Sequence, residues 1–121
     1  VVAQRLARVL CPNCKIKYRI GVNELKSSLP DFPIDENETS VELYKPGECM
    51  ECNGTGYKGR IGIFEILEVT DNIRKMILNR ASTADIMKAA VSEGMITMRQ
   101  DGLMKVKKGI TSVEEFLRII A

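Results

Sequence analysis

Four cysteines are the residues of this sequence whose spacing most directly predicts chemistry. They are the only cysteines among 121 residues, and they form two C-x-x-C pairs, Cys11 with Cys14 and Cys49 with Cys52. A C-x-x-C turn lets two sulfurs bind one ion from one short loop, and two such loops complete the tetrahedral thiolate shell of a zinc ion. Because four protein ligands leave no position for water, we predict that these cysteines bind a structural rather than a catalytic Zn²⁺.

Other uses of paired cysteines fit the sequence less well. Two disulfides would require an oxidising compartment and would more usually join distant cysteines. A redox-active C-x-x-C pair is expected at the start of a helix that follows a strand, and neither pair is predicted there. A different soft metal ion in the same cage of four thiolates stays open as an alternative to zinc.

The remaining composition argues against several function classes. The sequence has no histidine and no G-x-x-x-x-G-K-[ST] motif, so neither an imidazole base nor a P-loop phosphate site is predicted. The net charge of +2 is small for a dedicated nucleic-acid binder, and no apolar run is long enough to cross a bilayer. We therefore predict no catalytic residues, no cofactor-binding residues, no nucleic-acid partner and no membrane span in these 121 residues.

Local patterns predict the elements that position the two cysteine pairs. Residues 1–10 carry apolar side chains at helical spacing, which predicts a helix leading into the first pair. Residues 23–29 predict a short helix with Asn23 as its N-cap. Alternating apolar residues predict a short strand over residues 41–44, and β-branched residues predict a longer strand over residues 60–69.

Start and stop signals predict helices throughout the last fifty residues. Ser or Thr followed three residues later by Asp, Gln or Glu indicates a capping box, and glycine often follows the last helical residue. We therefore predict an α+β fold, with a zinc-stapled α/β module over residues 1–69 and a small helical bundle over residues 70–121. The predicted helix starts are Asp71, Ser82, Thr97 and Ser112, and the predicted stops are Gly94 and Gly109.

Three segments, taken in order, resemble a known protein family. These segments are AQRLARVLCPNCK, CMECNGTGYKGRIGIFEIL and MITMRQDGLMKVKKGITSVEEFLRI. Their order resembles the C-terminal part of the secretion-superfamily ATPases that drive type II secretion and type IV pilus assembly. The assembly branch of that family is similar in carrying a tetracysteine zinc insert just before a G-Y-x-G-R-x-G-I-x-E segment. Here that segment comprises Gly56, Tyr57, Gly59, Arg60, Gly62, Ile63 and Glu65.

The resemblance implies a function for a longer parent protein, of which we expect this chain to be a C-terminal fragment. The parent would be a cytoplasmic hexameric ring that hydrolyses ATP with Mg²⁺, peripheral on the bacterial inner membrane. Its partners would be neighbouring ATPase subunits and the cytoplasmic parts of inner-membrane secretion or pilus proteins. The ATP-binding motifs would lie upstream of Val1, so this chain would supply the structural zinc site and contacts rather than catalysis.

Two alternative functions remain open from the motifs. Residues 49–56 also match C-x-x-C-x-G-x-G, the zinc repeat of Hsp40-type chaperones, although that family uses four copies and this chain has one. A zinc-ribbon nucleic-acid module would place aromatic residues beside a basic stripe. The residues that could form a thin version of such a stripe are Tyr18, Arg19, Tyr57, Lys58 and Arg60.

Overall fold

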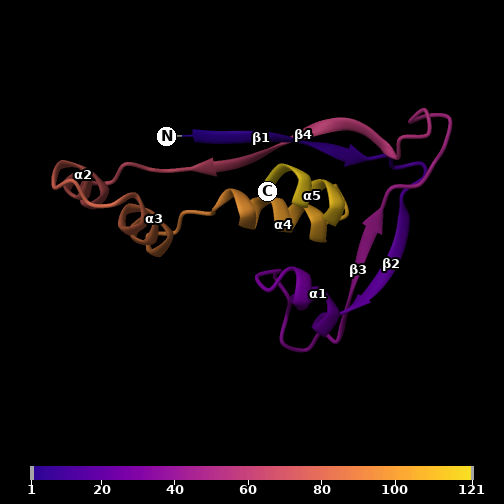
Figure 1. Cartoon of the computed structure of the whole chain (residues 1–121), viewed down its shortest axis with the longest axis horizontal. Helices are drawn as coiled ribbons and strands as arrows, with labels where there is room; N and C mark the ends of the chain where they lie inside the picture. The colour runs from indigo at the N-terminus through magenta and orange to yellow at the C-terminus, as the bar shows by residue number, and fades with distance from the viewer. Residues whose placement is uncertain (1, 121) are drawn as a thin grey trace.

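The fold is α+β, as the sequence predicts. The computed structural model describes residues 2–120, and within that range it contains five helices and two separate two-stranded antiparallel sheets. Figure 1 shows the elements in chain order. They are β1 (Val2–Leu10), β2 (Ile16–Gly21), α1 (Val22–Ser28), β3 (Ser40–Lys45), β4 (Tyr57–Ile66), α2 (Asp71–Leu78), α3 (Thr83–Ser92), α4 (Met98–Lys107) and α5 (Val113–Ile120).

The prediction of a helix over residues 1–10 is wrong. Val1 lies outside the described residues, and Val2–Leu10 forms strand β1, which pairs antiparallel with β4 from Val2 opposite Ile66 to Leu10 opposite Tyr57. The apolar spacing of this segment is compatible with a helix, but a partner strand some fifty residues away overrides that local preference. The local spacing of apolar residues does not reveal tertiary pairing of this kind.

The other elements of the first half are closer to expectation. Strands over residues 41–44 and 60–69 are confirmed as β3 and β4, although β4 runs from Tyr57 to Ile66. The short helix after residue 22 is confirmed as α1, but Gly21 occupies the N-cap and no side chain caps the helix, so the assignment of Asn23 as the cap is wrong. Strand β2, which pairs with β3, was not predicted.

The predicted starts and stops of the C-terminal helices are confirmed, except that one helix start is shifted by one residue. Thr97 and Gln100 form a complete capping box at α4, and Ser82 accepts a hydrogen bond from a backbone N–H at the start of α3. The cap of α2 is Thr70 rather than Asp71. Gly94 and Gly109 both have positive φ where α3 and α4 end, at 104° and 77°.

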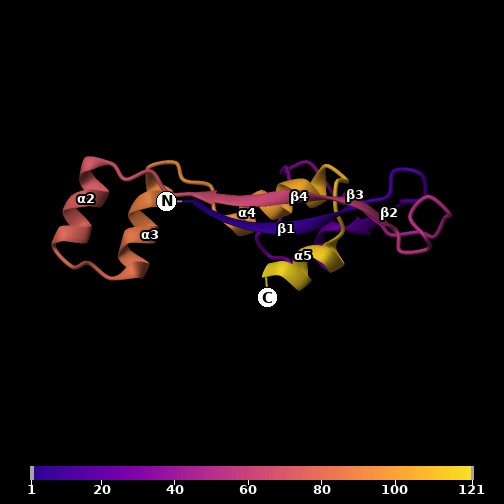
Figure 2. The ribbon, with the colours of Figure 1, turned by 90° about the horizontal axis from the view of Figure 1, so that it is seen from above.

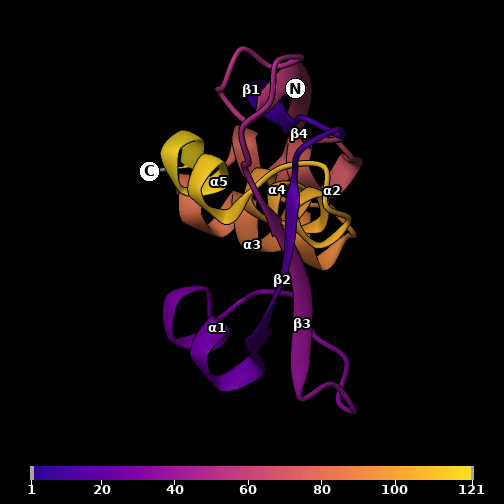
Figure 3. The same cartoon turned by 90° about the vertical axis from the view of Figure 1, so that its right-hand side faces the viewer.

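Helices α4 and α5 lie between the two sheets and join them into one structure (Figures 1 and 3). The larger apolar cluster combines side chains of α1 and β3 with side chains of α4 and α5, while the smaller one lies between α5 and the β1–β4 sheet. Helices α2 and α3 pack on each other at the far end of that sheet (Figure 2). The larger cluster therefore contains residues from both sides of the predicted boundary between residues 69 and 70. Its buried members are Leu25, Leu29, Phe32, Val41, Leu43, Leu103, Val106 and Phe116.

A buried carboxylate attaches α5 to the edge of β1. One Glu115 oxygen accepts hydrogen bonds from the Arg8 backbone N–H at 2.7 Å and from Arg8 Nε at 3.0 Å, and the other accepts from Arg118 Nε at 2.5 Å. The Glu115 side chain itself is fully buried. Burial alone would raise the pKa of Glu115, but the hydrogen bonds from Arg118 and Arg8 outweigh it and lower the pKa to about 2.

Replacing this carboxylate should change both the stability and its dependence on pH. Because the folded-state pKa of about 2 lies below the ordinary 4.5, the ion pairs stabilise the fold above pH 4.5 and lose this effect as the pH falls toward 2. We expect Glu115→Gln to lower the free energy of unfolding by about 2–3 kcal/mol at pH 7, and by about 1 kcal/mol less at pH 4. Urea denaturation at both pH values measures this difference.

The matched control is Glu114→Gln, one residue earlier on the same helix, where the side chain is exposed. It should stay within about 0.5 kcal/mol of the unsubstituted chain at both pH values. Equal effects of the two substitutions would contradict the role given to Glu115.

Candidate metal centre

The strand pairing brings the two C-x-x-C loops together. Cys11 and Cys14 lie in the loop from β1 to β2, and Cys49 and Cys52 lie in the loop from β3 to β4. Because β1 pairs with β4 and β2 pairs with β3, each loop passes from one sheet to the other at the same junction. Figure 1 shows both loops at the end of the β1–β4 sheet that is opposite α2 and α3.

The four sulfur atoms are spaced as ligands of one tetrahedral ion. All four lie within 4.8 Å of one another, with Sγ–Sγ distances of 3.7 Å for Cys11–Cys49, 3.7 Å for Cys14–Cys52 and 3.6 Å for Cys49–Cys52. A tetrahedron with zinc–sulfur bonds of about 2.3 Å has edges of about 3.8 Å. All four cysteines are free thiols, and these separations are too long for disulfide bonds. The residues therefore fit a four-thiolate metal site, as the sequence predicts.

Backbone hydrogen bonds shape both loops around the sulfur atoms. The Cys11 carbonyl accepts hydrogen bonds from the N–H groups of Cys14 and Lys15 at 3.3 and 3.0 Å, which closes the first turn. In the second loop, the Gly56 N–H donates to Cys52 Sγ at 3.2 Å, while the Gly56 carbonyl accepts from the Cys11 N–H at 2.9 Å. Gly56 therefore links the two loops and orients one of the four sulfurs, as the outer-shell groups of metal sites do.

The glycines of the second loop allow this close approach. Gly54 has a φ of 74°, a conformation that glycine adopts without steric cost, and it turns the chain after Cys52. Gly56 has a φ of 81°, and a Cβ atom placed there would lie 2.3 Å from Pro46 Cβ. Both the conformation and the space at Gly56 therefore require glycine.

The pKa values of Cys14 and Cys52 are shifted in opposite directions. Desolvation, followed by hydrogen bonds with the other three thiols, raises the pKa of Cys14 to about 12. Desolvation also acts to raise the pKa of Cys52, but hydrogen bonds from the Gly56 backbone and from Cys49 outweigh it and lower this pKa to about 6. A divalent cation bound between the four sulfurs would replace the thiol protons and stabilise the thiolates.

Residues after the second cysteine loop attach it to the C-terminal helices, through contacts that the sequence pattern does not predict. The Tyr57 hydroxyl lies 2.8 Å from Ser112 Oγ at the start of α5, and a Glu65 carboxylate oxygen accepts from the Met98 N–H at 2.8 Å at the start of α4. Ile63, between them on β4, is fully buried. The tyrosine and glutamate of the G-Y-x-G-R-x-G-I-x-E segment therefore position two helix N-termini.

The family model described as "Type II/IV secretion system protein" matches residues 1–118. The chain belongs to this family. The chain is also similar to the type IV pilus assembly ATPase TfpB of Acinetobacter baylyi, with 36% identity over 120 residues that make up 99% of this chain and 20% of that protein. The pilus assembly ATPase PilB of Thermus thermophilus is 41% identical over 97% of this chain and 13% of its own length.

The chain is similar to secretion proteins at comparable identity. The type II secretion system protein E of Dickeya dadantii is 39% identical over 98% of this chain and 22% of its own length. This chain thus spans about a fifth of the length of these relatives or less. Among residues 2–120, no helix combines the length and the apolar character needed to cross a membrane.

Proposed function

We propose that this chain is the C-terminal, zinc-binding part of a hexameric ATPase that powers type II protein secretion or type IV pilus assembly. In this proposal the zinc site is structural, and the chain provides contacts to neighbouring subunits or partners rather than catalytic groups. The observation that supports the proposal best is the convergence of Cys11, Cys14, Cys49 and Cys52 in a chain of the type II/IV secretion family.

The proposed zinc would hold the two sheets at a defined angle. Each cysteine loop connects a strand of one sheet to a strand of the other, so one ion bound by all four sulfurs would cross-link both connections. With a shell of four thiolates, the ion would have no open position for water or substrate. Its effect would therefore be on shape, through the placement of the β2–β3 sheet and α1 relative to β1 and β4.

The parent protein would supply the catalytic chemistry. The two pilus assembly relatives are named as ATPases. At least three quarters of the length of each of the three relatives lies outside the match, since this chain covers 13–22% of them. We propose that the groups binding ATP and Mg²⁺ lie before residue 1. We further propose a cytoplasmic location, peripheral to the bacterial inner membrane. We also propose that this chain divides into residues 1–69 and 70–121, and that this division serves the contacts to neighbouring subunits or partners.

The nucleic-acid alternative has less support. Arg19 forms an ion pair with Glu42 at 2.6 Å, and the Tyr57 hydroxyl is engaged with Ser112, so two members of the possible stripe already have partners in the fold. A gel-shift assay at low salt would separate the alternatives, because a nucleic-acid module would retard the probe and lose that effect as salt rises.

Metal content tests the proposal most directly. Elemental analysis and native mass spectrometry of the purified protein should find one zinc ion per chain. The same measurement on the Cys14→Ser variant should find the zinc content reduced by at least tenfold. A metal-free protein that is nevertheless fully ordered would contradict the structural zinc. In the full-length protein, the same substitution should abolish secretion or pilus assembly.

A further inference from the structure

The four sulfurs of the metal centre include two close pairs that each join one loop to the other. Cys11 Sγ lies 3.7 Å from Cys49 Sγ, and Cys14 Sγ lies 3.7 Å from Cys52 Sγ. We call Cys11–Cys49 and Cys14–Cys52 the inter-loop pairs. A disulfide bond is about 2.05 Å long, so each sulfur has to move by only about 0.8 Å to close one. Because the two pairs share no cysteine, both bonds can form in the same molecule.

Each inter-loop pair combines one accessible cysteine with one protected cysteine. Cys14 and Cys49 are half-buried, whereas Cys11 and Cys52 are buried. An oxidant in solution reaches an accessible thiolate first, and the sulfenic acid that forms is resolved by a neighbouring thiolate. Cys49 and Cys14 are therefore the attacking cysteines of the two pairs, and Cys11 and Cys52 are the resolving ones.

The backbones of the two loops meet at two points that involve no side chain of a cysteine. The Cys11 N–H donates to the Gly56 carbonyl at 2.9 Å. Gly47 lies so close to Cys14 that a Cβ atom on this glycine would be 2.1 Å from the Cys14 carbonyl oxygen. Each contact holds one cysteine of an inter-loop pair against the opposite loop. The pairs therefore stay adjacent while their sulfurs react.

We propose that the four cysteines are an oxidation site for hydrogen peroxide, at which both inter-loop pairs become disulfides and the bound metal ion is released. In each pair the thiolate of the half-buried cysteine attacks a peroxide oxygen. An S–O bond forms and the O–O bond breaks, which gives a sulfenic acid and a hydroxide ion. The buried thiolate then attacks the sulfenic sulfur, so that the S–S bond forms and a second hydroxide leaves.

The electrons and protons of this reaction balance with peroxide as the only oxidant. Each pair of thiolates loses two electrons, which one peroxide accepts. The complete reaction therefore consumes two peroxides per chain, and the four hydroxide ions take up protons from the solvent to become water. Because the thiolate is the form of cysteine that binds metal, closing both disulfides removes all four ligands of the ion.

Oxidation exchanges one link between the two sheets for another. The two disulfides connect the same loops as the ion, and each joins residues 38 positions apart, so they restrict the unfolded chain. The oxidised protein therefore keeps its fold without metal, and a thiol reductant reverses the change. This inference rests on the proposed function for the presence of the metal ion, but the pairing of the cysteines does not depend on it.

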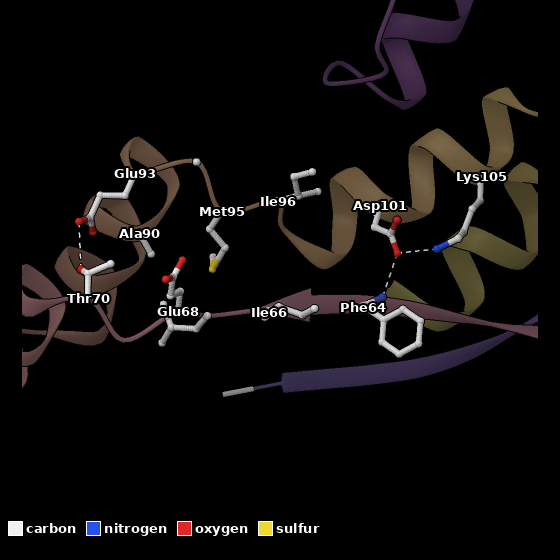
Figure 4. A pocket seen from close by; sticks show the side chains of 12 residues that line it. Phe64, Ile66, Glu68, Thr70, Ala90, Glu93, Met95, Ile96, Asp101 and Lys105 are labelled. Carbon is white, nitrogen blue, oxygen red and sulfur yellow. Dashed lines mark hydrogen bonds and ion pairs between the residues drawn. The ribbon is translucent and has the colours of Figure 1, made fainter.

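Methionine sulfur is the competing target of peroxide in this chain. Met50 lies between Cys49 and Cys52 and is 94% exposed. Met95 lines a groove of about 420 Å³ beside α3 and α4 (Figure 4). Oxidation of a methionine adds one oxygen to the mass and forms no cross-link, whereas each disulfide removes two hydrogens. Mass spectrometry therefore separates the two reactions.

Peroxide titration of the zinc-loaded protein tests the proposal. Two equivalents of hydrogen peroxide should release the zinc to a coloured chelator and lower the free thiols from four per chain to none. Trypsin cleaves after the lysines between the two loops, so without reduction both loop peptides should appear as one species joined by two disulfides. Fragmentation of this species should assign Cys11 to Cys49 and Cys14 to Cys52. The far-UV circular dichroism should stay that of the metal-bound protein.

Met50→Ser is the matched control, because it removes the most exposed competing sulfur and leaves the four cysteines in place. It should release zinc with the same two equivalents of peroxide and give the same two disulfides. Disulfides within a loop, such as Cys49–Cys52, disulfides between chains, or methionine oxidation with all thiols retained would overturn the proposal. Loss of the circular dichroism signal on oxidation would overturn it too.

The two proposals fail in different ways. The metal content that tests the proposed function is measured on the protein under reducing conditions, where no disulfide forms. The cysteine pairing is mapped with or without metal, so a reduced protein that lacks zinc would refute the structural zinc and leave the inter-loop pairs to be decided by the peptide map.

Discussion

Cys49→Ser is expected to remove the metal and to unfold most of this chain. Structural zinc contributes on the order of 10 kcal/mol to the folding of small metal-bound modules, which is comparable to the whole stability of a typical domain. Leu103 of α4 and Phe116 of α5 share an apolar cluster with Leu25 of α1. We therefore expect the C-terminal helices to lose order together with the metal loops. Far-UV circular dichroism and limited proteolysis would measure the loss.

The control for this substitution lies in the same loop. Met50 stands between the two cysteines and is 94% exposed, so Met50→Ser should keep one metal ion per chain and an unchanged digestion pattern. A Cys49→Ser protein that resists protease as well as the Met50→Ser protein would show that the fold does not depend on the metal. Chelator treatment of the unsubstituted protein should reproduce the effect of Cys49→Ser.

The second large effect is expected at Phe116. Its side chain is fully buried, and a Cβ atom at Gly102 on α4 would lie 2.8 Å from its ring, so the two helices meet closely at this point. Phe116→Ala should lower the free energy of unfolding by about 3–5 kcal/mol, through lost burial and the cavity that remains. Urea denaturation of the metal-bound protein, followed by circular dichroism, would measure this change.

The neighbouring residue supplies a matched control. Leu117 is 44% exposed on the same helix, and Leu117→Ala should cost less than about 1 kcal/mol. Because Phe116 lies away from the cysteines, the Phe116→Ala protein should still bind one metal ion per chain when folded. A loss of stability no greater than that of Leu117→Ala would contradict the central place of Phe116 in the core.

The sequence predicts those features that depend on local chemistry. The spacing of the thiols predicts the cluster of four cysteines. Caps such as Thr97 and stops such as Gly109 predict the C-terminal helix boundaries, because each signal acts within a few residues. Three segments of the sequence resemble the secretion ATPases. The match of the type II/IV secretion family model to residues 1–118 confirms this resemblance.

Non-local contacts account for what the sequence did not predict. The local pattern of residues 2–10 predicts a helix, and the strand forms because β4, which is distant in sequence, pairs with it. The short apolar pattern of β2 predicts no element, and this strand forms by pairing with β3. The contact of Glu115 with Arg8 joins residues 107 positions apart, and a glutamate at the start of a helix predicts only a favourable capping position. These contacts depend on the tertiary arrangement, which local patterns do not encode.

The crossing of both cysteine loops between the two sheets also has a consequence for the order of folding. Cys11 and Cys49 are 38 positions apart, and bringing such distant points of an unfolded chain together costs about 3 kcal/mol of loop-closure entropy. Binding of an ion by the thiols early in folding would offset this loss of entropy before any strand has paired. Both antiparallel ladders could then grow outward from the same junction, so the supply of metal during synthesis would govern how fast the polypeptide matures.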